Sequence, residues 1–151
     1  MPTNPPELSA HLGYLLRQVS NHVSHAFARK VAVKDVTVAE WVVLRVLHGK
    51  PPTSPSILAE ELGMTRGAIS KLADRLIGKT LASREPRPDD GRAQTLQLTT
   101  RGTRLVPELA RLADQNEFEC FAHLDSEDVR TLQRILKETI ARLGITAMPI
   151  E

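Results

Sequence analysis

The stretch "SPSILAEELGMTRGAISKLADRL", residues 54–76, predicts two short helices joined by a sharp turn. Ser54 is a typical N-cap, and Gly63 is typical of the residue that ends a helix. A helix-turn-helix also needs a small residue where its helices cross and a β-branched residue that faces inward on the second helix. Ala59 and Ile69 meet these two needs. We therefore expect a helix-turn-helix here.

The second helix of this motif has one apolar face and one polar face. Its apolar residues recur at helical spacing and are expected to face inward: Ile69, Leu72, Ala73 and Leu76. The polar face suits the major groove of DNA, where Arg, Lys and hydroxyl groups meet base edges and phosphates. The alternative is an ordinary solvated helix face. From the motif we predict DNA contacts by Ser54, Thr65, Arg66, Gly67, Ser70, Lys71 and Arg75.

A charged hairpin is predicted directly after this helix. Its strands are expected at 81–84 and 93–99, the second because Leu96 and Leu98 alternate with polar residues. The connecting loop, "EPRPDDGRAQ" at 85–94, contains two prolines that stiffen it. A hairpin in this position is a wing, and the alternative is an incidental exposed loop.

The wing adds cations to the predicted interface. We expect Arg92 to enter the minor groove and Asp90 to orient its guanidinium, with Arg84 and Arg87 as further DNA contacts. Residues 65–104 hold nine Lys or Arg and four Asp or Glu, a net charge of +5, whereas the rest of the chain carries −3. This distribution favours a polyanion such as double-stranded DNA as the partner.

Long amphipathic helices are predicted toward both ends of the chain. A first helix is expected at 8–29, and two more at 100–122 and 126–143. A shorter helix begins at the capping box of Thr37 and Glu40. The terminal helices have apolar stripes that nothing else in so short a chain covers, so we expect a homodimer. The expected fold class is mainly α, a winged helix-turn-helix with a two-stranded wing and long N- and C-terminal dimerisation helices.

Composition excludes several other classes of protein. The 151 residues are 41% hydrophobic, 25% charged and only 3% aromatic, which favours a helical core of Leu, Val, Ile and Ala. No apolar stretch is long enough to cross a membrane, the N-terminus lacks the features of a secretion signal, and a single cysteine excludes an intrachain disulfide framework. We therefore expect a cytoplasmic protein. Because phosphate loops, nucleophile elbows and metal-hydrolase helices are also missing, we expect neither an enzyme nor a cofactor.

Four stretches of the chain together resemble the MarR family of transcription regulators. They are "LGYLLR" at 12–17, the helix-turn-helix at 54–76, "REPRPDDGRAQTLQLTTRGTRL" at 84–105 and "LDSEDVRTLQRIL" at 124–136. The resemblance implies dimerisation helices in residues 1–34 and 101–151 and a DNA-binding lobe in 35–100. It also implies a repressor that binds a pseudo-palindromic operator and is released by a small ligand.

Two positions depart from the family pattern. Thr80 stands where the family usually has glycine, so we expect the start of the first wing strand to be built differently. Gly91 stands where the family often has a basic residue, which leaves the wing tip one cation poorer.

The effector is not identified by the sequence. By position in the family, His11, Tyr14 and Trp41 are candidates to bind a small molecule, with an aromatic compound among the options; the alternative for all three is core packing. A redox-sensing variant would use Cys120. A metal-sensing variant would use His22 with His25, or Cys120 with His123, at helical spacing. A winged-helix module that binds only proteins is the remaining alternative.

Overall fold

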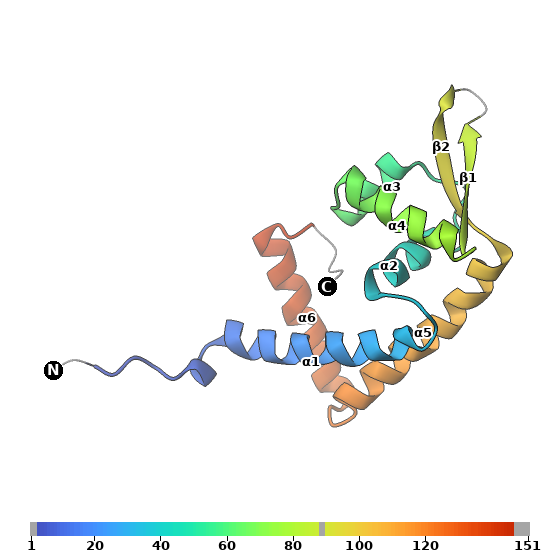
Figure 1. The fold of residues 1–151 in the computed structure, drawn as a ribbon. Helices are drawn as coiled ribbons and strands as arrows, with labels where there is room; N and C mark the ends of the chain where they lie inside the picture. Colours follow the sequence, from blue (N-terminus) through green and yellow to red (C-terminus); the bar gives the residue numbers. More distant parts are fainter. Residues whose placement is uncertain (1–2, 88–89, 147–151) are drawn as a thin grey trace.

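The computed structural model describes residues 3–87 and 90–146, with the side chains at 87 and 90–93 outside that description. Within these residues the chain is mainly helical, with one two-stranded antiparallel sheet (Figure 1). The expected fold class is confirmed. The elements are η1 (Leu8–Ala10), α1 (Leu12–Ala32), α2 (Val38–Leu47), α3 (Pro55–Leu62), α4 (Arg66–Gly78), β1 (Ala82–Arg87), β2 (Asp90–Leu98), α5 (Thr100–Phe121) and α6 (Ser126–Leu143).

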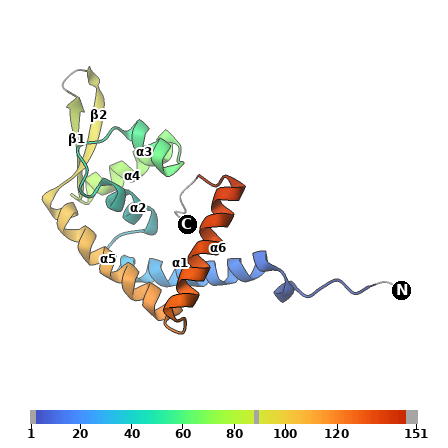
Figure 2. The ribbon, with the colours of Figure 1, turned by 180° about the vertical axis from the view of Figure 1, so that it is seen from behind.

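The long helices form one side of the molecule and the short ones the other. Helices α1 and α5 pack against each other, and α6 turns back from the end of α5 (Figures 1 and 2). Helices α2, α3 and α4 gather into a lobe at the start of α5, and the β1–β2 hairpin projects from it. The hairpin and α4 therefore belong to the same end of the molecule.

One hydrophobic core holds this lobe together. Helices α2, α3, α4 and α5 and both strands contribute buried side chains to it. Leu44, Leu58, Leu62, Ile69 and Leu76 are among those with no exposed surface. Each fully buried side chain of this size stabilises the fold by roughly 1.5–3 kcal/mol, so α4 is held firmly on the lobe.

The first helix differs from its predicted bounds of 8–29. A 3-10 turn covers Leu8–Ala10, His11 adopts an extended backbone with φ −96° and ψ 127°, and α1 begins only at Leu12. The helix then continues to Ala32, because its last turn carries the fully buried Val31.

Both strands are longer than the predicted 81–84 and 93–99 toward the hairpin tip. Pairing runs from Ala82 opposite Leu98 to Pro86 opposite Gln94, and the register shifts between Pro86 and Arg87. A proline fits this two-stranded sheet because an edge strand leaves one side of its backbone unpaired. The expected loop at 85–94 is therefore partly strand.

Candidate nucleic-acid interface

The turn between α3 and α4 has the predicted glycine at its bend. Gly63 takes the left-handed conformation, with φ 63° and ψ 32°. The N–H of Met64 donates to the carbonyl of Ala59 at 2.9 Å, which closes the end of α3. Ala59 and Ile69 are buried, as expected for the residues where the two helices cross.

Hydroxyl groups cap both helices of the motif. The Ser54 Oγ accepts the N–H of Ile57 at 3.3 Å, and the Thr65 Oγ1 accepts the N–H of Ala68 at 3.1 Å. Each hydroxyl retains its own O–H as a donor. Ser54 and Thr65 can therefore cap a helix and donate to a DNA phosphate at the same time.

The two faces of α4 divide as the sequence predicts. Ile69, Leu72, Ala73 and Leu76 are buried. The opposite face is exposed and consists of the cap Thr65 with Arg66, Gly67, Ser70, Lys71, Asp74 and Arg75. A Cβ added at Gly67 would meet only Thr65 Oγ1, at 4.0 Å, so the fold itself does not require a glycine there. This face can meet a partner without any rearrangement of the core.

An ion pair links α4 to the wing. The Arg84 Nη2 lies 2.8 Å from the Asp74 Oδ1. Exposed ion pairs contribute little stability, but this one fixes the direction of Arg84 relative to the helix. Arg84 was predicted at the interface without its partner Asp74, because a contact between a helix and a strand cannot be read from spacing.

The wing is also fastened to the lobe near its base. The backbone groups of Thr53 and Leu96 exchange hydrogen bonds of 3.0 and 2.8 Å, so the segment before α3 runs beside β2. The expected contact between Asp90 and Arg92 lies outside the described residues, as does the side chain of Arg87.

Similarity to known proteins identifies the group to which this architecture belongs. A sequence model of the MarR family matches residues 34–93. The multiple antibiotic resistance protein MarR of Escherichia coli is 28% identical over 130 residues, which cover 85% of this chain and 90% of that protein. A solved structure of a cysteine-to-serine mutant of E. coli MarR with operator DNA is 27% identical; its TM-score is 0.77, and the match covers 85% of this chain and 93% of that one. The sequence match over residues 34–93 and the shared fold support assignment of the chain to the MarR family.

The similarities therefore support a transcriptional regulator with a winged-helix fold, and the named relatives form a non-enzymatic class. Another relative is named as an HTH-type transcriptional repressor in Mycobacterium bovis; it is 26% identical over 129 residues, covering 85% of this chain and 93% of that protein. The family relationship supports DNA as the partner of the α4 face and the wing. Among the described residues, no helix is long and apolar enough to span a membrane.

The regulator anchors the C-terminal end of α4 through Lys79. The Lys79 Nζ donates to the Asp35 carbonyl at 2.7 Å and to the Glu40 Oε1 at 3.0 Å. Glu40 has no exposed surface and also accepts the N–H of Thr37 at 2.9 Å, which completes the predicted capping box. Burial raises the pKa of Glu40, but hydrogen bonds from Thr37 and Lys79 and the charge of Lys79 lower it more, so the net pKa lies below the usual value.

The start of the wing is held by α5. Thr80 has φ 61°, the left-handed conformation that a glycine would readily adopt. The expectation that threonine in place of the family's usual glycine changes the start of the first wing strand is therefore wrong. The threonine is kept in this conformation by its surroundings: Arg101 Nη1 donates to Thr80 Oγ1 at 2.7 Å and to the Lys79 carbonyl, and Thr99 Oγ1 donates to the Thr80 carbonyl at 2.7 Å. Left-handed geometry in a β-branched residue costs about 1–2 kcal/mol, which these contacts offset.

A close contact with the backbone of Leu81 explains why residue 102 is a glycine. A Cβ added at Gly102 would lie 2.1 Å from the carbonyl oxygen of Leu81. The first turn of α5 therefore packs directly on the turn that connects α4 to β1. This junction was not predicted, although a glycine inside the first turn of a long helix is a recognisable signal of close packing.

The predicted effector residues are not gathered in one place. Trp41 packs against Phe27 in the core, with ring centroids 6.2 Å apart and planes at 79°. His11 and Tyr14 lie at the exposed start of α1. A groove of about 830 Å³ between α1, α5 and α6 is lined by Cys120, His22 and His123 among mainly apolar residues, and by none of the three candidates. Their role in ligand binding stays a prediction.

The sensing variants also remain alternatives. Cys120 is a partly exposed free thiol, and its neighbours in the groove include two histidines. Across residues 3–87 and 90–146, no three His, Cys, Asp or Glu side chains are placed to hold a metal ion.

Proposed function

We propose that this regulator is a homodimeric repressor that binds a pseudo-palindromic operator and releases it when a small molecule binds. The observation that carries the DNA-binding part is the division of α4. Its buried face fixes it to the lobe, and its exposed face presents two arginines and a lysine beside the wing. A helix of this kind enters the major groove while a hairpin arginine reaches the adjacent minor groove.

Uncovered apolar stripes support the dimer. Helix α6 buries none of its residues within the chain, and Leu132, Ile135, Leu136 and Ile140 are 38–46% exposed. The first half of α1 is similar, with Leu12, Leu15, Leu16 and Val19 at 41–77% exposure. Apolar surface of this extent marks an interface. A second copy, whose identical stripes can pack against these, is the occupant we propose.

In the proposed dimer the parts of the chain have separate tasks. Residues 1–34 and 101–151 form the dimerisation helices, and residues 35–100 form the DNA-binding lobe. A two-fold dimer presents two copies of α4, so its operator should contain two inverted half-sites about one helical turn, roughly 34–36 Å, apart. In this proposal the DNA contacts are Ser54, Thr65, Arg66, Gly67, Ser70, Lys71, Arg75, Arg84, Arg87, Asp90 and Arg92.

Repression and release follow from the same geometry. A dimer that covers about two turns of DNA can block a polymerase, and the M. bovis relative is named as a repressor. A small molecule that changes the angle between the dimerisation helices and the lobe would alter the separation of the two α4 helices. His11, Tyr14 and Trp41 stay the candidates to bind it.

Selection of bound DNA from a random pool tests this function. The proposal predicts enrichment of inverted repeats, and sedimentation should find a dimer both free and on DNA at micromolar concentration. Recovery of unrelated sequences, or a folded monomer at that concentration, would contradict it. Compounds that release the enriched DNA would then identify the effector.

A further inference from the structure

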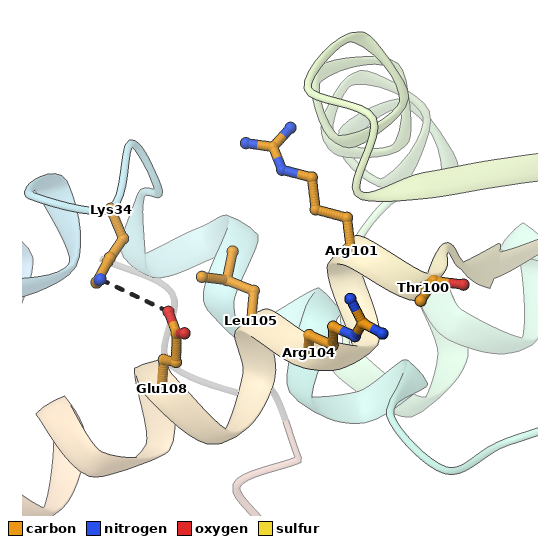
Figure 3. A pocket seen from close by; sticks show the side chains of 6 residues that line it. All are labelled: Lys34, Thr100, Arg101, Arg104, Leu105 and Glu108. Atoms are coloured by element: carbon orange, nitrogen blue, oxygen red, sulfur yellow. Dashed lines mark ion pairs between the residues drawn. The ribbon is translucent and has the colours of Figure 1, made fainter.

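A cationic cavity opens at the start of α5. Its volume is about 520 Å³, and it is lined by Lys34, Thr100, Arg101, Arg104, Leu105 and Glu108 (Figure 3). Small-molecule sites commonly have volumes of about 300–1,000 Å³. The cavity is therefore large enough for a ligand of several heavy atoms.

Charge decides which ligand the cavity suits. Three of its side chains are cationic and one, Glu108, is anionic. Glu108 lies 3.6 Å from Lys34, and both side chains are nearly half exposed, so this pair is loose. Arg104 makes no ion pair within the described residues. The first turn of α5 contains no acidic residue, although a helix start favours anions. The excess of positive charge favours an anion.

The lining also has a shape that suits such a ligand. Leu105 lies between the Lys34–Glu108 pair and Arg101, which extends toward α4 (Figure 3). Arg101 uses Nη1 for Lys79 and Thr80; among the described residues, the N–H groups of Nη2 and Nε have no acceptor and can serve a ligand. A carboxylate or phosphate group matches the two parallel N–H groups of that free edge.

We propose that this cavity binds a small anion, with a carboxylate or phosphate group held by Arg101 and Arg104 and any apolar portion against Leu105. The cavity is distinct from the region of His11, Tyr14 and Trp41. It is also separate from the proposed contacts at the wing tip, because the nine residues of β2 place the tip about 30 Å from the base of the wing. Through Arg101, the bound anion would touch the turn that ends α4.

Calorimetry on the full chain without DNA tests the site, so the outcome is independent of the proposed function. The probes are inorganic phosphate and hexanoate, and binding of either supports the proposal. Binding of phosphate alone would show that an anionic group is sufficient for binding. Binding of hexanoate alone would show that the site takes an organic carboxylate. Absence of saturable binding of both probes up to about 10 mM, the limit of useful affinity, overturns it.

Matched variants locate the site. Arg104→Gln should weaken binding about tenfold, since it removes a charged hydrogen bond, and Glu108→Gln should strengthen binding because it removes the carboxylate of the lining. Arg111→Gln, an exposed change on the same helix outside the cavity, should leave binding unchanged. Backbone amide resonances of Thr80 and Leu81 should shift with the ligand, and those in α6 should not. Equal binding by Arg104→Gln and wild type, or shifts confined to α6, would refute this location.

Discussion

The Lys79 Nζ lies 3.0 Å from both carboxylate oxygens of Glu40, a side chain with no exposed surface. The Oε1 atom accepts hydrogen bonds from Lys79 and Thr37, whereas Oε2 accepts none from the described residues. Lys79 follows α4 directly and Glu40 lies in the first turn of α2. A buried charge therefore ties the end of the proposed recognition helix to the lobe.

Replacing Lys79 should destabilise the folded protein. Lys79→Met leaves the Glu40 carboxylate buried without its cation, and we expect a loss of about 3 kcal/mol in the free energy of unfolding. Denaturant unfolding measures this change. Lys71→Met, an exposed change on α4, should alter stability by less than about 0.5 kcal/mol. The double variant Lys79→Met with Glu40→Gln should recover part of the loss, and no recovery would show that the charge of Glu40 is not the cause.

Low pH should weaken the interaction between Lys79 and Glu40. The pKa of Glu40 in the folded protein lies below its ordinary value of 4.5. Between the two values the unfolded chain binds a proton that the folded chain does not, so stability falls as pH decreases below about 4.5. Glu40→Gln removes this contribution. Unfolding free energies from pH 7 to 3 should therefore fall more steeply for wild type than for Glu40→Gln, and parallel curves would contradict the assignment.

The contact between α5 and the turn before β1 should not tolerate a side chain. In Gly102→Ala the new Cβ would meet the Leu81 carbonyl oxygen at 2.1 Å, so one of the two segments must move. We expect a loss of at least about 2 kcal/mol in stability. Gly78→Ala is the control, because its Cβ would have no atom within 4 Å. Thermal unfolding of both variants measures the difference, and similar melting temperatures would rule out the close approach.

Gly67 should matter for DNA and not for folding. Gly67→Ala has room in the structure and should raise helix stability by up to about 1 kcal/mol. If the backbone of α4 approaches the DNA closely at this point, the added methyl group should lower operator affinity about tenfold, or 1.4 kcal/mol. Gly78→Ala should bind like wild type. Unchanged binding by Gly67→Ala would mean that this glycine does not approach the DNA.

Local patterns in the sequence predict the helices and their caps well. Ser54, Thr65 and the Thr37–Glu40 box act through hydrogen bonds within three residues, and such bonds leave a direct signature in spacing. The division of α4 into two faces follows from helical periodicity for the same reason. These signals were sufficient for the helix-turn-helix and for the choice of its exposed residues.

Contacts between distant residues could not be predicted in the same way. Arg101 reaches Thr80 across 21 positions, and Lys79 reaches Glu40 across 39. The left-handed Thr80 also opposes the local preference of a β-branched residue and is stable only because α5 holds it. The cationic cavity unites Lys34 with the start of α5, so the sequence alone gave no indication of it.

The most direct test of DNA recognition by α4 compares two DNAs in one titration series. Fluorescence anisotropy is measured on the selected operator and on a scrambled sequence, for wild type and the variants Arg66→Ala, Lys71→Ala and Arg111→Ala. If Arg66 contacts a base edge, Arg66→Ala should lose about 1–3 kcal/mol on the operator and much less on scrambled DNA. Lys71→Ala should weaken both DNAs alike, as expected of a phosphate contact, and the exposed control Arg111→Ala should change neither. Equal losses on both DNAs for Arg66→Ala, or none at all, would contradict sequence reading by this residue of α4.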